Sequence, residues 1–409
     1  MNDSKLVQRF IRYITTPTQS DDTSKTVPST PTQHVLAKML GQELRDLGLS
    51  DVKVTEHAYV TAKLPGNNPT APCIGLIAHI DTALEVTDDT VNPRIVENYD
   101  GTPIVLDKGG TTVLSPDAFP SLKDHIGSDL IVTDGTTLLG ADDKAGIAEI
   151  MTAVEYLKDH PEISRGDVAV CFCPDEEIGH GASLLDLKDF GAQFAYTVDG
   201  TGSDTFNWET FNAARADYHI QGLAVHPGSS KNKMVNANLL AAELIDAFPP
   251  AETPSHTEDR EGFYHLCEMT GGVEEAELHY IIRDHDRQKF ESRKAFAELV
   301  ARQMNERFGR EVVTVSVSDQ YANMADVLRE KPEIVDTALQ AMKDCGITPQ
   351  VIPVRGGTDG SQLSLRGLPT PNLFTGGYNA HGKYEYAVIQ SMEGAVKVLC
   401  RIVELFGKR

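Results

Sequence analysis

The stretch Val168-Ala-Val-Cys-Phe-Cys-Pro-Asp-Glu-Glu-Ile-Gly179 joins a short apolar run to three consecutive acids and a glycine. Residues 168–173 are apolar throughout, which is typical of a strand buried on both faces of a parallel sheet. Pro174 ends that strand, so the acids at 175–177 lie at its carboxyl end, where open α/β sheets bind ligands. Clustered acids repel one another unless a cation offsets their charge. Because an acid run after a strand is most often a solvated loop, other segments have to decide between the two interpretations.

Four other segments also bring a histidine or a carboxylate to the end of an apolar run. With the residues that follow, they are 73–78 (His79, Asp81), 136–139 (Asp142, Asp143), 194–198 (Asp199) and 372–375 (His381). Five such segments at one edge of one sheet favour a metal site over a set of unrelated turns.

The candidate ligands are two imidazoles and three carboxylates: His79, Asp142, Glu177, Asp199 and His381. These nitrogen and oxygen donors suit zinc, cobalt or manganese. Five protein ligands exceed what one catalytic zinc needs, so we expect two ions that share a carboxylate and a bridging water. One of the adjacent acids Glu176 and Glu177 would bind metal and the other would move the proton, an assignment that the pattern alone leaves open.

Length and charge restrict the class of protein. A chain of 409 residues suggests two domains. The net charge of -23 argues against nucleic acid or an anionic membrane as a partner. No apolar stretch is long enough for a membrane helix and the N-terminus has no signal-peptide pattern, so we expect a cytoplasmic protein. The six cysteines are scattered and are expected to be free thiols.

The pattern of elements predicts an α/β fold with a mixed, mostly parallel sheet flanked by helices. Residues 1–210 and 322–409 are expected to form this catalytic domain, and 211–321 an inserted ferredoxin-like α+β lid. Residues 51–64 are expected to form one strand. The acids between 84 and 135, Glu85 and Asp88 among them, are attributed to solvated turns.

Several strings in the chain resemble the dinuclear-zinc family that holds aminopeptidases, aminoacylases and carboxypeptidases. The resemblance covers nearly the whole chain, and the strings at 355–361 and 374–382 are most similar to those of its tripeptide-specific aminopeptidases. The matching segments are 79–81, 139–149, 174–179, 196–200, 226–228, 355–361 and 374–382.

The resemblance implies that Asp142 bridges two metal ions, expected to be zinc. One ion also binds His79 and Asp199, and the other also binds Glu177 and His381.

It further implies that Glu176 is the general base, that Asp81 orients His79, and that the peptide bond between Asp142 and Asp143 is cis. Without the resemblance, the spacing already places Asp81 on the same side of an extended chain as His79, where it could accept the second ring N–H. A turn-capping role for Asp81 is the alternative.

Two residues, His226 and Arg283, are expected to contact substrate by the same resemblance. His226 would donate to the oxyanion, although Pro227 and Gly228 also permit a local capping role. Arg283 would bind the substrate carboxylate, and Arg355 could serve the same end. A salt bridge to one of the many acids would explain either arginine equally well.

Together these features predict an aminopeptidase that hydrolyses the N-terminal peptide bond of tripeptides. The alternatives are a dipeptidase or an N-acyl-amino-acid deacylase of the same family, and a non-catalytic metal-dependent binding protein. A base beside the metals counts against the last. Relatives often pair through the inserted module, so a homodimer stays open, as do the native metal, the side-chain preference and any domain closure.

Overall fold

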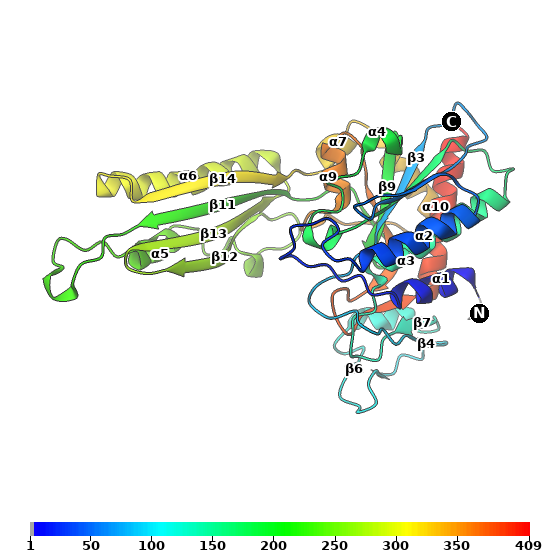
Figure 1. The fold of residues 1–409 in the computed structure, drawn as a ribbon, viewed down its shortest axis with the longest axis horizontal. Helices are drawn as coiled ribbons and strands as arrows, with labels where there is room; N and C mark the ends of the chain where they lie inside the picture. Colours follow the sequence, from blue (N-terminus) through cyan, green and yellow to red (C-terminus); the bar gives the residue numbers. More distant parts are fainter. Residues whose placement is uncertain (1–3) are drawn as a thin grey trace. The chain divides into compact units, whose positions relative to one another are not determined.

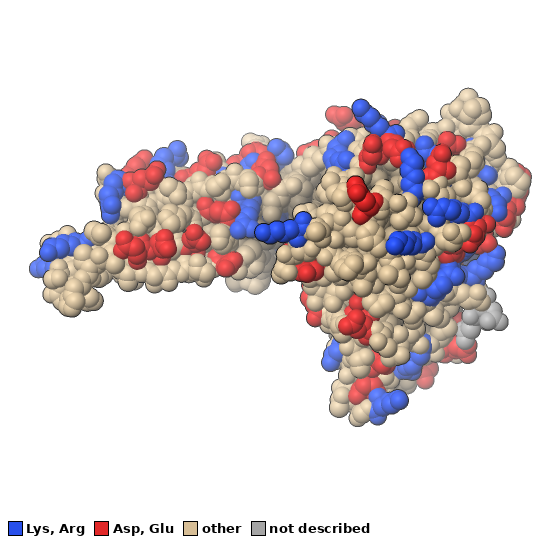
Figure 2. All heavy atoms as spheres, in the orientation of Figure 1, with Lys and Arg blue, Asp and Glu red and all other residues tan. Residues whose placement is uncertain are grey.

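A computed structural model describes residues 4–409, which form two compact units. The first unit holds the described part of 1–208 together with 326–352 and 358–409, and the second holds 209–325 and 353–357. Acidic and basic side chains are interspersed over the visible face of each unit (Figure 2). Among the described helices, none is both long enough and apolar enough to cross a membrane.

The first unit is built on an 11-stranded mixed sheet with a parallel centre (Figure 1). Its path runs β1-β2-β8-β3-β9-β16-β17-β7-β4, and β10 and β15 join beside β16. The four central strands β8, β3, β9 and β16 pair in parallel, and the other strands along this path pair antiparallel. Beside the path, β10 pairs antiparallel with β16 and parallel with β15. The strands of this unit are β1 (Ser50–Val54), β2 (Val60–Leu64), β3 (Ile74–His79), β4 (Arg94–Val96), β5 (Ile104–Val105), β6 (Val113–Leu114), β7 (Leu130–Val132), β8 (Val168–Cys173), β9 (Phe194–Thr201), β10 (Thr205–Asn207), β15 (Gln350–Val351), β16 (Asn372–Tyr378) and β17 (Tyr386–Val388).

Helices cover both faces of the central strands, so every side chain of β3 and β8 is buried. On one face α3 packs against β3 and β16, and α10 packs against α3 and β16. On the other face Cys171 and Ile77 pack with residues of α4 and α9 in one apolar cluster. The helices are α1 (Lys5–Ile14), α2 (Gln33–Asp46), α3 (Ala141–Asp159), α4 (Leu187–Phe190), α7 (Ala325–Leu328), α8 (Pro332–Asp344), α9 (Asp359–Leu365) and α10 (Ile389–Gly407). The expected α/β class is confirmed.

The second unit has the strand and helix order of a ferredoxin-like fold. Its four strands pair antiparallel in the order β12-β13-β11-β14, and α5 and α6 pack on one face of the sheet. Apolar residues alternate along β11 and β13 so that one set faces the helices. The elements are β11 (Asn212–Gln221), α5 (Ala237–Asp246), β12 (Phe263–Gly271), β13 (Glu275–Asp284), α6 (Arg287–Phe308) and β14 (Val313–Tyr321).

Residues 51–64 depart from the single strand that we expected. They form the hairpin of β1 and β2, in which Thr55 donates its N–H to the carbonyl of Tyr59. Ala58 adopts a positive φ of 63° in the turn. This conformation is uncommon outside glycine, asparagine and aspartate, so no turn residue marks the hairpin in the sequence.

Glu149 is a carboxylic acid buried within α3. Its side chain is 0% exposed, and among residues 4–409 neither of its carboxyl oxygens has a hydrogen-bond partner. Burial raises the pKa of Glu149 well above its ordinary value. The folded protein therefore holds a proton that the unfolded chain releases near pH 4 to 5. The contribution of Glu149 to the free energy of unfolding is therefore fully present below its pKa in the unfolded chain. It falls as the pH rises from that value toward the higher pKa of the folded protein.

We expect Glu149→Met to stabilise the protein at pH 8 by about 1 to 3 kcal/mol, because it removes an unpaired buried carboxyl. Near pH 4 the gain should shrink, since the wild-type carboxyl is then neutral in the folded protein and largely neutral in the unfolded chain. Glu149→Gln is the matched control: it removes the titration but keeps a buried polar group. Thermal or denaturant unfolding at both pH values measures the difference, and an equal gain at both would contradict the assignment.

Candidate metal centre and active site

The carboxyl ends of the parallel strands bring the candidate residues together. His79 is the last residue of β3, and it lies in register with Cys173 at the end of β8. Glu177 follows β8 in a short 3-10 turn, and Asp199 lies within β9. The loop that joins β16 to β17 carries His381.

Asp142 lies between the two histidines, and each of its carboxylate oxygens faces a different ring. Its Oδ1 is 2.9 Å from Nε2 of His79, and its Oδ2 is 3.4 Å from Nε2 of His381. Asp199 Oδ1 lies 3.5 Å from the His79 nitrogen, and Glu177 Oε2 lies 3.1 Å from the His381 nitrogen. These side chains form two groups of three ligands, and both groups contain Asp142. Within each group, the ligand atoms all lie within 4.8 Å of one another.

Two acids of this cluster, Asp199 and Glu177, are short of compensating charge, whereas Asp142 is not: despite its burial, hydrogen bonds from His381 and His79 lower its pKa. Burial raises the pKa of Asp199 to about 7 and also raises the pKa of Glu177. Hydrogen bonds to Asp142 and Glu177 raise the pKa of His381 to about 11. Oε1 of Glu177 is buried and has no hydrogen-bond partner within residues 4–409. An orphaned carboxylate oxygen beside nitrogen and oxygen donors fits a divalent cation at the group that contains Glu177. The donor set of the other group, one imidazole and two carboxylates, also suits such a cation.

Glu176 precedes the ligand Glu177 in the same turn. Burial raises the pKa of its carboxyl well above the ordinary value, and the charges of Asp199 and Asp359 act in the same direction. A carboxyl in this environment can hold a proton taken from a neighbouring molecule, which suits acid and base chemistry.

Asp81 connects the histidine strand to the glutamate turn. Its fully buried carboxylate accepts the backbone N–H of Glu176 at 3.0 Å and that of Glu177 at 3.1 Å. Ser20 Oγ donates to the same carboxylate at 2.5 Å. Nδ1 of His79 lies 3.0 Å from the main-chain oxygen of Asp81 and 3.4 Å from its carboxylate. Both oxygens are within reach of the ring, and the carbonyl is nearer.

Two aspartates next to candidate ligands, Asp143 and Asp175, bind protein N–H groups, a role that the sequence did not indicate. The Asp142–Asp143 peptide bond is cis, as the resemblance implies, and the Asp143 carboxylate accepts the N–H of His79 at 3.1 Å. Asp175 adopts a positive φ of 56°. Its carboxylate accepts the N–H of Ser29 at 2.7 Å and Nε2 of Gln33 at 2.6 Å. Their position next to known motif residues was the only signal that could have indicated them.

The expectation that Glu85 and Asp88 are merely solvated is wrong for Asp88. Asp88 is 2% exposed, and its carboxylate accepts Oγ1 of Thr82 at 3.0 Å and lies 3.8 Å from Nζ of the buried Lys144. Glu85 is exposed, and its carboxylate lies 3.4 Å from Nδ1 of His381.

The other three candidate residues belong to the second unit. His226 is exposed and caps the turn Pro227–Ser229, with Nδ1 accepting the N–H of Gly228 at 3.1 Å. Arg283 donates from Nη1 to the carbonyls of Ala214 and Ile282, and lies over the ring of Tyr321.

Arg355 has a dense set of partners inside the second unit. Its Nη1 donates to the carbonyls of Asp259 and Glu261, each at 3.0 Å, and its Nη2 donates to Oγ1 of Thr257 at 2.8 Å. The guanidinium also lies 5.2 Å from the ring centroid of Phe211. These contacts describe a structural role, and substrate binding by Arg355 stays a prediction.

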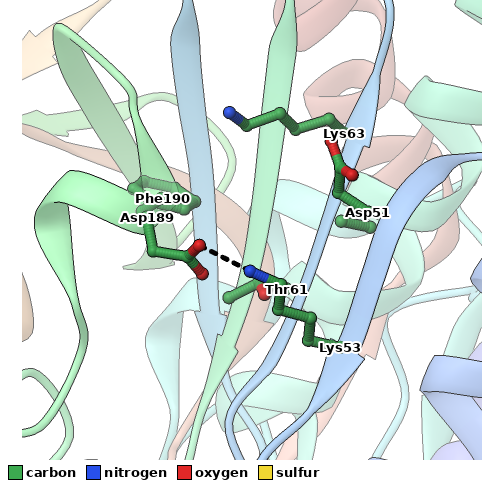
Figure 3. Close-up of a pocket in the computed structure, with 7 residues that line it drawn as sticks. Asp51, Lys53, Thr61, Lys63, Asp189 and Phe190 are labelled. Carbon is green, nitrogen blue, oxygen red and sulfur yellow. Dashed lines mark hydrogen bonds and ion pairs between the residues drawn. The ribbon is translucent and has the colours of Figure 1, made fainter.

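A surface pocket beside β1, β2 and α4 contains none of the candidate residues (Figure 3). Lys53 and Asp189 form an ion pair across it at 2.5 Å, with about half of each side chain exposed. Exposed ion pairs of this kind contribute little energy and are common on protein surfaces. We assign this pocket no function.

Comparisons with known proteins agree on one family. The model of the peptidase family M20/M25/M40 matches residues 132–405. A protein called peptidase T from Caldanaerobacter subterraneus subsp. tengcongensis is 51% identical over 407 residues, which cover 99% of this chain and 100% of the relative. Two solved structures have a similar fold at 22% identity, each covering 99% of this chain and 98% of the other: aminopeptidase PepT from Bacillus cereus, with a TM-score of 0.76, and a tripeptidase from Staphylococcus aureus, with a TM-score of 0.75.

Proposed function

The chain belongs to the peptidase family M20/M25/M40, and we propose that it is a cytoplasmic aminopeptidase that removes the N-terminal residue of tripeptides at a centre of two divalent metal ions. The observation that carries this proposal is the position of Asp142 between two groups of ligand atoms. A carboxylate shared in this way is the arrangement that two-metal hydrolytic sites need.

The chain's own side chains supply a donor set for each ion. His79 and Asp199 would hold one, Glu177 and His381 the other, and Asp142 both. We propose zinc as the native metal, because imidazole and carboxylate donors suit it well. When bound, the ions would polarise the scissile carbonyl and lower the pKa of a water molecule.

Glu176 is the proposed general base. Its carboxylate would take the proton from the attacking water and later give it to the leaving amine, a transfer that requires a carboxyl able to hold the proton between the two steps. Asp81 would keep Glu176 in place, since it accepts the N–H of both glutamates in the turn.

The second unit supplies the proposed contacts to substrate. We propose that His226 donates to the oxyanion and that Arg283 binds the substrate carboxylate. Arg355 is the weaker candidate of the two arginines, because Thr257, Asp259 and Glu261 already accept from two of its nitrogens.

Peptide-length profiling of the zinc-loaded protein tests this function. We expect kcat/KM for a tripeptide to exceed that for the matching di- and tetrapeptides by at least about tenfold, or about 1.4 kcal/mol of transition-state binding. The newly released residue should be the N-terminal one by mass spectrometry. N-acyl amino acids are the control for a deacylase, and the chelated protein is the control for metal dependence.

Equal rates on dipeptides or on N-acyl amino acids would replace the proposal by one of these two related activities. Metal binding without hydrolysis of any of these amides would favour a binding protein. Elemental analysis of the purified protein identifies the native metal.

A further inference from the structure

Glu385 is a buried carboxylate that binds the backbone of the segment carrying Asp142. Its side chain is 1% exposed. Oε2 accepts the N–H of Leu139 at 2.7 Å and that of Gly140 at 2.8 Å, and Oε1 accepts the N–H of Asp142 itself at 3.1 Å. Three converging N–H donors occupy both oxygens, so this carboxylate replaces the secondary structure that the segment lacks.

The segment needs such support because its backbone is irregular. Gly140 adopts a positive φ of 79°, and Asp142 and Asp143 have non-helical φ and ψ values although they lie in the first turn of α3. Their N–H groups therefore cannot rely on regular helix or sheet pairing. A carboxylate is an acceptor at both oxygens, which makes it well suited to hold several N–H groups in a fixed arrangement.

Glu385 also lies in the loop that carries His381. Tyr378 of β16 pairs with Tyr386 of β17, which closes the base of this loop. Within the loop, Nδ2 of Asn379 donates to the carbonyl of Tyr384 at 3.1 Å, and Glu385 donates its N–H to the carbonyl of Gly382 at 3.1 Å. Hydrogen bonds within the loop therefore stabilise its conformation, and the Glu385 carboxylate connects the loop to the segment that carries Asp142.

We propose that Glu385 is a positioning residue that sets the Asp142 carboxylate relative to His381 so that both metal ions can bind. This inference rests on the proposed two-metal centre and concerns a residue outside its ligand set. Glu385 would act on Asp142 as outer-shell partners act on other metal ligands. Loss of such a partner lowers metal affinity by about 10- to 100-fold.

The test begins with protein from which the metal has been removed by a chelator. This protein is titrated with Zn²⁺ in competition with a chromophoric chelator, and the visible spectrum of the Co²⁺ form is recorded as a second readout. Glu385→Gln keeps the shape but replaces one acceptor oxygen by an NH₂ group that would face an N–H donor. We expect its affinity for the more weakly held ion to fall by about 10- to 100-fold, with an altered Co²⁺ spectrum. Glu385→Asp keeps the charge and both acceptor oxygens, and should bind more tightly than Glu385→Gln.

Asp129→Asn is the matched control. Asp129 is similarly buried, at 8% exposed, and accepts the N–H of Asn98 at 2.8 Å in the same unit. Its variant should lose some thermal stability while both metal constants stay at the wild-type values. A merely structural role for Glu385 would give this same pattern.

Wild-type metal constants in a folded Glu385→Gln variant would overturn the inference. If that variant does not fold, Glu385→Asp decides in its place, because its side chain is one methylene shorter and its oxygens cannot reach all three N–H groups at their wild-type positions. Weakened binding that is still tighter than expected for an uncharged side chain supports the positioning role, and wild-type binding of both ions rejects it. Failure of the wild-type protein itself to bind two ions would instead reject the proposed function, so the two outcomes are distinct.

Discussion

Replacing Glu176 by alanine should lower kcat/KM for a tripeptide by about 10²- to 10⁴-fold while the protein still binds two metal ions. The reason is that Glu176 belongs to neither ligand group, whereas Glu177 from the same turn belongs to one of them. Its removal takes away the proton acceptor and leaves all five donors. Both kcat and kcat/KM should fall together, because the proton moves only in the transition state. Steady-state kinetics and elemental analysis of the same preparation measure the two quantities.

The neighbouring glutamate provides the contrast for this experiment. Glu177→Ala should lose one ion as well as activity, since Glu177 lies 3.1 Å from His381 at the second group. Glu176→Gln tests charge at constant size and should be nearly as inactive as Glu176→Ala. Glu56, whose side chain is 88% exposed, is the surface control, and Glu56→Ala should change neither activity nor metal content. Wild-type turnover in Glu176→Ala would remove the general base from the mechanism.

The central strands were predictable because burial on both faces leaves a direct mark on sequence. Residues 168–173 and 74–79 are almost wholly apolar, and both form strands in which every residue is buried. The candidate ligands were predictable for a related reason, because they follow these runs directly. Asp142 and His381 lie far apart in the chain, yet the parallel topology brings them to one edge.

Residues whose partners are backbone groups were much harder to predict. Asp88, Asp175 and Glu385 accept backbone N–H donors from distant segments, and such donors occur in almost every residue. No spacing or composition rule distinguishes an acid that binds a remote N–H from one that is solvated. The turn at Ala58 escaped prediction for a local reason, since an alanine with positive φ carries no turn signal.

Asp142→Ala should be the most damaging ligand substitution, because it is the only one expected to affect both ions. Each oxygen of Asp142 faces a different histidine, at 2.9 Å for His79 and 3.4 Å for His381. The variant should retain less than one ion after dialysis. Loss of the Lewis acids should lower kcat/KM by at least about 10³-fold, as expected when several kcal/mol of charge stabilisation disappear.

Ligands that belong to only one of the two groups provide the comparison for Asp142→Ala, because their loss should remove one ion and leave the other. Asp199→Ala removes a donor from the His79 group alone, and His381→Ala removes one from the Glu177 group alone. Each variant should keep about one ion by elemental analysis, the remaining group with Asp142 still supplying three donors, which is enough for a catalytic-type zinc site. Asp189→Ala, at the exposed ion pair with Lys53, serves as the control and should keep two. If Asp142→Ala retained one ion as firmly as Asp199→Ala does, Asp142 would belong to one group only, and a shared carboxylate could no longer explain why five donors converge at this edge of the sheet.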